Sequence, residues 1–156
     1  MRSVGSDVPD RCVVGELPRI VLDTNVLVAA VTSREGVSAR LLLAASAGRF
    51  QLVVSPLLLD ELSDVLARPK FRRYLSIEDA HQFVDAIRNL AIIVDDPPKE
   101  DDPITADPDD DFLVLLAEVA GADVLVSGDP DLTTVQRRGL VVMTPRAFLE
   151  DLEQPI

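Results

Sequence analysis

"RIVLDTNVLVAA", residues 19–30, is apolar along most of its length, yet Asp23, Thr24 and Asn25 interrupt it near the middle. The residues before Asp23 suit a buried strand, and the apolar residues after Asn25 suit a buried helix. A buried strand that leads directly into a helix is typical of an α/β protein. The feature that needs an explanation is the carboxylate of Asp23 at the junction of the two elements.

On either side of this stretch, short apolar runs alternate with longer segments of helical periodicity. The alternation indicates βαβ units and predicts an α/β fold, in which helices cover both faces of a central parallel sheet. Ser55 with Pro56, and Asp107 with Pro108, each form an N-cap followed by a first-turn proline. The expected strands are residues 19–22, 51–54, 91–94, 123–126 and 140–142, and the expected helices are residues 38–47, 55–67, 76–90 and 107–120, with a short one from Pro145.

Acidic residues from distant parts of the chain are expected to meet at one edge of this sheet. In an open parallel sheet, ligands bind beyond the carboxyl ends of the strands. Asp23 follows the first expected strand and Asp129 follows the fourth, while Glu61 lies on the helix after the second strand. Asp110 and Asp111 lie in the first turns of a later helix. We therefore expect four carboxylates to converge.

A carboxylate cluster of this kind predicts bound cations, because crowded acids repel and raise one another's pKa. All-oxygen ligands select hard ions, and Mg²⁺ or Mn²⁺ fits carboxylate and water coordination best. Such ions can polarise a phosphodiester and lower the pKa of a bound water molecule. His81, the one histidine of the chain, lies in the middle of an amphipathic segment, which disfavours a histidine-based triad or zinc site.

Each acid also has a simpler interpretation. Asp23 and Asn25 can cap the following helix, and the acids near Asp110 are favourable at the positive end of a helix dipole. Asp129 can belong to an ordinary turn, and Glu61 can lie on a solvated helix face. The whole set is harder to explain in this way than any single member of it.

The composition indicates a single water-soluble globular domain. The chain has 156 residues, of which 47% are hydrophobic and 27% charged, and no apolar run is long enough to span a membrane. Cys12 is the only cysteine, so an intramolecular disulfide or a multi-cysteine metal site cannot form. We expect a cytoplasmic protein. Residues 1–17 mix glycine, proline and charged residues, and we expect them to form a flexible N-terminal extension.

The formal net charge of −12 argues against a nucleic-acid binder, because phosphates are bound mainly by Lys and Arg. The charge is unevenly distributed, however. Nine carboxylates lie between Asp95 and Asp111, whereas "ARPKFRRYL" contains four cations within six residues. These cations could be ordinary solvated charges, or they could form a local track for phosphates together with Arg34 and Arg40. The four are Arg68, Lys70, Arg72 and Arg73.

The chain resembles PIN-domain ribonucleases, in particular the prokaryotic VapC-like toxins of toxin–antitoxin pairs. The resemblance rests on four segments in this order: "VLDTNVLVAA", "SPLLLDELSDVLARPKFRRYLS", "DPDDDFLVLLAEVAGADVLVSGDPDL" and "VVMTPRAFL". It implies a three-layer α/β/α domain over residues 18–150, with a central sheet of about five parallel strands, and a C-terminal tail over residues 151–156. It also implies a Mg²⁺- or Mn²⁺-dependent endoribonuclease that cleaves single-stranded RNA, forms a homodimer, binds an antitoxin that blocks its site and is not associated with a membrane.

The family's pattern also assigns site residues. The catalytic, metal-binding acids fall on Asp23, Glu61, Asp111 and Asp129. The supporting residues fall on Thr24, Asn25 and Ser127. The run "DPDDDFL" leaves the register open by one residue, so Asp110 is the reserve candidate for Asp111, and Asp131 could be an additional outer ligand. The cations of residues 68–73 would contact RNA, and the bound metal would neutralise much of the acid.

Two other classes of function remain open at this point. Haloacid-dehalogenase-like phosphatases also have an aspartate after the first strand, but they need a second aspartate two residues later, where this chain has Asn25. A non-catalytic binding or scaffolding domain of the same fold would use its acids as helix caps and solubilising charge. Trapping of a phosphoaspartate at Asp23 would support the first, and the absence of acid-dependent manganese binding would support the second.

Overall fold

The structure is a computed structural model of the chain, and it describes residues 17–99, 102–105, 107–135, 137 and 139–154. At its centre lies a sheet of five parallel strands, which are β1 (Arg19–Leu22), β2 (Gln51–Val54), β3 (Ile92–Ile93), β4 (Val124–Val126) and β5 (Val141–Met143). The α-helices are α2 (Thr24–Thr32), α3 (Val37–Ser46), α4 (Pro56–Leu66), α5 (Ile77–Leu90), α6 (Pro108–Val119), α7 (Pro130–Thr133) and α8 (Pro145–Glu153). A short 3₁₀ helix, η1 (Pro69–Arg73), follows α4. The predicted α/β fold with a parallel sheet is therefore confirmed.

The observed elements differ from the expected ones mainly at their ends. β3 comprises two residues where four were expected, although the backbone N–H of Val94 still donates to the carbonyl of Val54 at 2.9 Å. The caps lie where the sequence indicates, since the side chains of Ser55 and Asp107 each accept a hydrogen bond from the first turn of their helix. Two short elements, η1 and α7, were not expected as helices.

The strand order β3-β2-β1-β4-β5 locates the point at which a ligand site is expected. The chain adds β2 and β3 on one side of β1 and then crosses over to add β4 and β5 on the other side. β1 and β4 pair in parallel, with Leu22 opposite Val126. Asp23 and Ser127, which follow these two residues, therefore leave the sheet side by side at the topological switch point between β1 and β4.

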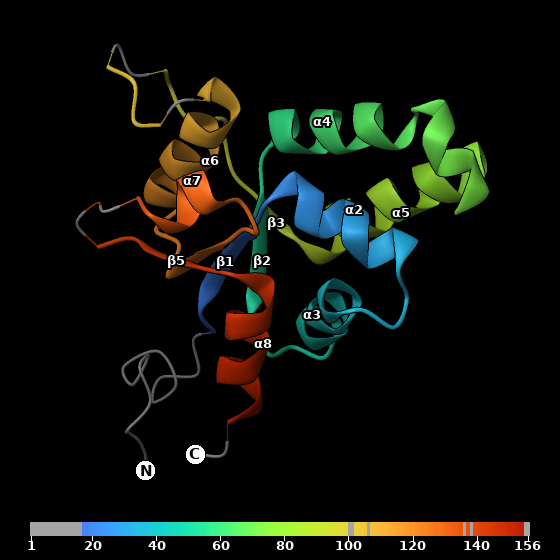
Figure 1. Cartoon of the computed structure of the whole chain (residues 1–156), viewed down its shortest axis with the longest axis horizontal. Helices are drawn as coiled ribbons and strands as arrows, with labels where there is room; N and C mark the ends of the chain where they lie inside the picture. The colour runs from blue at the N-terminus through green and yellow to red at the C-terminus, as the bar shows by residue number, and fades with distance from the viewer. Residues whose placement is uncertain (1–16, 100–101, 106, 136, 138, 155–156) are drawn as a thin grey trace.

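Helices lie on both sides of the strands. Figure 1 shows α6 and α7 on one side and the group α2, α3, α4 and α5 on the other. α6 contacts β1 and β4, α2 packs against α3 and α4, and α8 packs against α3. This arrangement is the layered α/β/α architecture that the alternation of strands and helices predicts.

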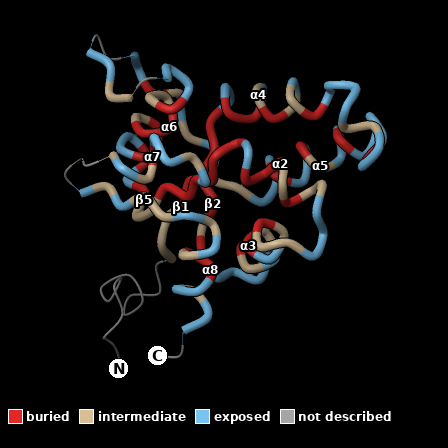
Figure 2. The backbone as a smooth tube through the Cα atoms, viewed as in Figure 1, coloured by how far each residue is buried: buried red, intermediate tan, exposed pale blue. Residues whose placement is uncertain are grey.

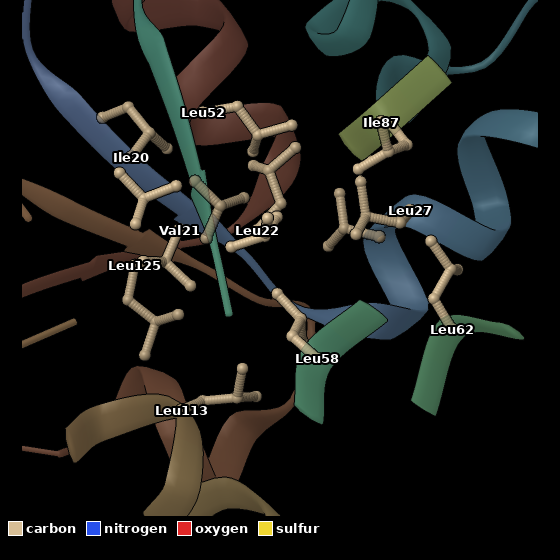
Figure 3. Close-up of a cluster of buried hydrophobic side chains, with 14 of the residues drawn as sticks. Ile20, Val21, Leu22, Leu27, Leu52, Leu58, Leu62, Ile87, Leu113 and Leu125 are labelled. Atoms are coloured by element: carbon tan, nitrogen blue, oxygen red, sulfur yellow. The ribbon is translucent and has the colours of Figure 1, made fainter. Parts of the chain in front are cut away.

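The core surrounds the central strands. In β1, Ile20, Val21 and Leu22 are fully buried, and in β4 Leu125 is fully buried as well. Figure 2 shows the central strands in the colour of buried residues, and Figure 3 shows apolar side chains packed around β1 and β2. Burial on both faces explains why the strands read as continuous apolar runs rather than as alternating patterns. Their carboxyl ends are thus fixed by a well-packed sheet.

Several sequence-based expectations concern the ends of the chain. Cys12 and most of the expected N-terminal extension lie outside the described residues. At the other end, α8 continues to Glu153, beyond the expected domain end at residue 150, and Leu152 packs partly against the core. His81 is exposed on α5. No helix in the described part of the chain is both long enough and apolar enough to cross a bilayer.

Candidate metal centre

Asp23 occupies the junction between β1 and α2. Its backbone N–H donates to the carbonyl of Val126 at 2.9 Å, which joins the end of β1 to the end of β4. Its side chain is 7% exposed and caps α2 by accepting from the backbone N–H of Asn25 at 3.4 Å. The second carboxylate oxygen, Oδ2, accepts a hydrogen bond of 2.8 Å from the hydroxyl of Ser127. Asp23 is thus a helix cap, but one whose carboxylate is fixed from two sides.

Ser127 also positions Asp129. The buried Ser127 hydroxyl donates to Asp23 and accepts from the backbone N–H of Asp129 at 3.0 Å. The Oδ1 atom of Asp129 in turn accepts from the backbone N–H of Asp131 at 2.9 Å, where α7 begins. One serine hydroxyl therefore links the acids that follow β1 and β4, which lie 106 positions apart in the sequence.

Asp110 supplies the third acid from the first turn of α6. Its side chain is 6% exposed, and its Oδ2 atom is buried without a hydrogen bond from any donor that the structure describes. One carboxylate oxygen from each of Asp110, Asp129 and Asp131 lies within 4.8 Å of the others. These three acids, called the acid triad below, come from the N-terminal ends of α6 and α7.

The electrostatics of the centre are those of crowded acids. Burial comes first among the causes that raise the pKa of Asp110 to about 7, followed by the closely placed carboxylate of Asp129 and the charges of Asp107 and Asp23. Burial also raises the pKa of Asp23, and the charge of Asp129 adds to this rise, against the hydrogen bonds from Ser127 and the backbone of Asn25. The interactions among Asp23, Asp110 and Asp129 indicate that the three share one electrostatic environment.

Asp111, which the sequence favours over Asp110 as the third acid, has its carboxylate elsewhere. Its oxygens accept hydrogen bonds from the backbone N–H groups of Ile104 and Thr105, at 3.1 and 2.6 Å, and from the Thr105 hydroxyl at 2.7 Å. Partial burial acts to raise the pKa of Asp111, but the hydrogen bonds from Thr105 and Ile104 and the charge of Arg137 outweigh it. The pKa of Asp111 is therefore lowered. Asp111 therefore fastens the preceding loop to α6, and its neighbour Asp110 faces the other acids.

Glu61 lies beside the centre rather than within the acid triad. It is half-buried on α4, and its Oε1 atom accepts a hydrogen bond of 2.6 Å from the hydroxyl of Thr24. Thr24 is buried and directly follows Asp23, so this bond connects α4 to the site. The Asn25 side chain is exposed, and the contact of this residue with Asp23 is through its backbone.

The acids fit a hard divalent cation on chemical grounds. Every candidate ligand is a carboxylate oxygen, the donor type that Mg²⁺ and Mn²⁺ prefer. The buried Oδ2 of Asp110 has no donor within the described ranges, and a buried carboxylate without a partner is costly unless a cation or a proton satisfies it. An open cleft of about 540 Å³ has Asp131 in its lining, but not Asp110 or Asp129. Its other lining residues are Pro103, Ile104, Thr105, Thr134, Val135 and Arg137.

The basic residues of the sequence lie apart from this centre. Arg68 and the cations of η1 follow the far end of α4, and Figure 1 shows the turn between α4 and α5 at the opposite end of the molecule from α6 and α7. Arg40 pairs with Glu153 on α8, and Arg34 is exposed between α2 and α3. Sequence reasoning gave no role at the site to Thr105 or Asp107. Thr105 holds the carboxylate of Asp111, and the charge of Asp107 helps to raise the pKa of Asp110. No motif marks Thr105, but the helix cap at Asp107 was visible.

Replacing Ser127 by Ala is expected to lower the free energy of unfolding by about 1 to 3 kcal/mol, because the change leaves a buried carboxylate and a backbone N–H without their shared partner. Urea denaturation followed by circular dichroism measures the loss. Thr134→Ala is the control, since its exposed hydroxyl bonds only nearby carbonyls and its loss should cost less than about 0.5 kcal/mol. Equal losses in the two variants would contradict the linking role of Ser127.

Comparison with known proteins relates the chain and its fold to a family. A sequence model described as PIN domain matches residues 19–131. The uncharacterised protein MJ1680 of Methanocaldococcus jannaschii is 25% identical over 146 residues, covering 87% of this chain and 92% of that protein. The structure of PAE2754 from Pyrobaculum aerophilum is similar at a TM-score of 0.61 and 17% identity, over 87% of this chain and 89% of that one. VapBC2 from Rickettsia felis, solved with a DNA fragment from its promoter, is similar at a TM-score of 0.55 and 15% identity, over 81% of this chain and 98% of that one.

Proposed function

The chain belongs to the PIN domain family, a family of nucleases, and on that premise we propose that it is a Mg²⁺- or Mn²⁺-dependent endoribonuclease that hydrolyses single-stranded RNA. The observation that carries the proposal is the buried carboxylate of Asp110. Its Oδ2 atom has no hydrogen-bond partner among the described residues, and one of its oxygens lies within 4.8 Å of carboxylate oxygens of Asp129 and Asp131. A helix cap or a solvated acid does not need this arrangement, whereas a metal ligand does.

In this proposal Asp110 and Asp129 hold the metal directly, with Asp131 as the outer, exposed ligand. Asp23 completes the site from the end of β1, and its hydrogen bond from Ser127 fixes the orientation of its carboxylate. Asp110 takes the position that the family's pattern offers to either Asp110 or Asp111. The positive ends of α2 and α6 add favourable potential for the carboxylates, which offsets part of their repulsion.

A divalent ion bound at such a site polarises a phosphodiester and lowers the pKa of a water molecule, so no serine or cysteine nucleophile is required. The chain itself contributes orientation and proton acceptance. The Oε1 atom of Glu61 is fixed by Thr24, and its Oε2 atom has no hydrogen-bond partner within the described residues. This second oxygen is available to orient a water molecule or to accept its proton.

The VapC-like branch of the family suggests which proteins this chain binds. We propose a cytoplasmic, VapC-like toxin that forms a homodimer and is inhibited by an antitoxin protein. The similarity to the VapBC2 structure supports this assignment at the level of fold. Purification with and without the product of a neighbouring gene, followed by an RNA cleavage assay, tests for the inhibitor.

Asp23→Asn is expected to abolish manganese-dependent cleavage of single-stranded RNA while the fold stays intact. The amide can still accept the Ser127 hydrogen bond, but it removes a negative charge from the metal site. Cleavage of a labelled RNA in Mn²⁺ and in EDTA, with circular dichroism of the same samples, measures both effects. Undiminished cleavage by Asp23→Asn would refute the assignment.

The same samples separate the other classes. The phosphatase alternative is not favoured, because the residue two positions after Asp23 is Asn25, whose side chain is exposed, and because the family match is to a nuclease family. A purely scaffolding domain would bind no manganese in calorimetry, or would bind it equally well after Asp110→Asn and Asp129→Asn.

A further inference from the structure

The turn between α4 and α5 carries a concentrated positive surface. Arg68, Lys70 and Arg73 are exposed there, next to Tyr74, whose side chain is 52% exposed. We call these four residues the basic tip. Figure 1 shows the α4–α5 turn at one end of the long axis of the molecule, beyond the last turn of α4.

The cations of this turn have no acidic partners in the part of the chain that the structure describes. Arg68, Lys70, Arg72 and Arg73 make no ion pair with any residue in the described part of the chain, although the protein carries a net charge of −12. Elsewhere on the surface, Arg40 pairs with Glu153, Arg88 with Asp85 and Arg137 with Glu118. An acidic protein that leaves four neighbouring cations unpaired keeps a local positive potential that would attract an anion.

Arg72 strengthens this potential from inside the turn. Its guanidinium donates through Nη2 to the carbonyl of Leu66, at the end of α4, while its Nε and Nη1 atoms are buried without a hydrogen-bond partner among the described residues. A buried charge without a counter-ion is costly. Anions bound at the surface above it would lower that cost, because interactions near a protein surface are less screened than in bulk water.

Aromatic rings lie between the charges. The Lys70 ammonium is 5.2 Å from the centre of the Phe71 ring, and the Arg73 guanidinium is 5.4 Å from the centre of the Tyr74 ring. Of the two rings, that of Tyr74 is exposed, whereas Phe71 is partly buried and packs against the core. Cations beside an exposed aromatic ring are a combination by which proteins hold single-stranded nucleic acids, with cations on the phosphates and a base stacked on the ring. An acidic polypeptide would use the cations but would have no bases to stack on Tyr74.

We propose that the basic tip binds the backbone of single-stranded RNA at a second site, separate from the acid triad. This inference rests on the proposed function for the identity of the ligand. α4 has 11 residues, so the tip lies about 16 Å beyond the start of that helix at the edge of the sheet. Because a stacked strand rises about 3.4 Å per nucleotide, RNA that reaches both the basic tip and the acid triad has to span several nucleotides.

The test measures binding without cleavage. A 5′-fluorescein-labelled 16-nucleotide oligouridylate is titrated with protein in EDTA at several KCl concentrations, and fluorescence anisotropy gives the affinity. The tip variant carries Arg68→Ala, Lys70→Ala and Arg73→Ala. The control variant carries Arg40→Ala, Arg88→Ala and Arg146→Ala, which remove the same charge from exposed positions elsewhere. A third variant, with Arg68→Lys and Arg73→Lys, keeps the charge of the tip, and circular dichroism checks the folding of all three.

For a single strand, the logarithm of the binding constant falls with the logarithm of the salt concentration, with a slope of about −0.7 per phosphate contact. Losing three contacts should therefore make this slope less steep by about 2. We expect this change, with at least tenfold weaker binding at low salt, in the tip variant only. The lysine variant should retain the wild-type slope. If the tip and control variants share one slope and one affinity, or if a labelled 16-residue polyglutamate binds as tightly as the oligouridylate, the proposal is overturned.

Cleavage in Mn²⁺ separates this inference from the proposed function. The tip variant should raise KM for a long RNA and leave kcat unchanged, because the tip is remote from the reacting phosphate. If the wild-type protein cleaves no RNA but the tip variant still loses its salt slope, the nuclease assignment fails and the binding site stands. If the wild-type protein cleaves and the tip variant matches it in both KM and salt slope, the binding site fails and the nuclease assignment stands.

Discussion

Asp110→Asn is expected to lower kcat/KM for RNA cleavage at least about a thousandfold, which corresponds to about 4 kcal/mol of transition-state stabilisation. The substitution leaves the shape of the side chain nearly unchanged but removes the charge of the most buried member of the acid triad. An amide offers one neutral oxygen to a divalent ion in place of a carboxylate. Initial rates at saturating and limiting RNA in Mn²⁺, together with manganese calorimetry, measure the loss of both activity and metal affinity.

Asp111→Asn is the matched control, because it makes the same chemical change one residue later. Its carboxylate accepts three hydrogen bonds from Ile104 and Thr105, so the variant should lose about 1 to 2 kcal/mol of stability and retain cleavage within a few-fold. Urea denaturation measures the first effect. If Asp111→Asn abolishes cleavage and Asp110→Asn does not, the metal site has the register that the family's pattern first suggests, and the site described above is assigned to the wrong residue.

The fold was largely predictable because its signals are local. β1 and β2 are buried on both faces, and their apolar runs have the expected bounds. The caps at Ser55 and Asp107 mark where α4 and α6 begin. What the sequence could not show was the length of edge elements, since β3 pairs with β2 alone and α7 has only four residues. Elements this short depend on tertiary contacts rather than on a periodic pattern.

The candidate site was predictable in its composition but not in its register. The parallel topology brings Asp23 and Asp129 together whatever the details of the loops. Asp110 and Asp111 are different, because neighbouring residues on a helix point about 100° apart and three consecutive aspartates leave several rotations equally plausible. The choice is made by Thr105, whose contact with Asp111 depends on how the preceding loop folds back onto α6.

Asp110 should also make the metal-free protein sensitive to pH. Its pKa is raised from 3.8 to about 7 in the folded protein, so the folded state binds its proton more tightly than the unfolded state does. The stability that this proton contributes is fully present below about pH 4 and is lost as the pH rises through about 7. Because one pKa unit corresponds to about 1.4 kcal/mol, the loss between about pH 4 and pH 8 has an upper bound of about 4 kcal/mol.

Asp110→Asn removes this ionisation, so in EDTA at pH 8 we expect the variant to be more stable than the wild-type protein, and near pH 4 the two should be similar. Mn²⁺ should reverse the order at pH 8, since it stabilises only the protein that binds it. Thermal unfolding from pH 4 to pH 8, with EDTA or Mn²⁺, tests both statements. Asp109→Asn serves as the control, because the Asp109 side chain lies in the same turn but is exposed. The contradicting result would be a wild-type protein that is as stable as Asp110→Asn, or more stable, in EDTA at pH 8. It would show that the charged Asp110 carboxylate does not destabilise the metal-free protein. The main physical reason for a metal ion at this centre would then be removed.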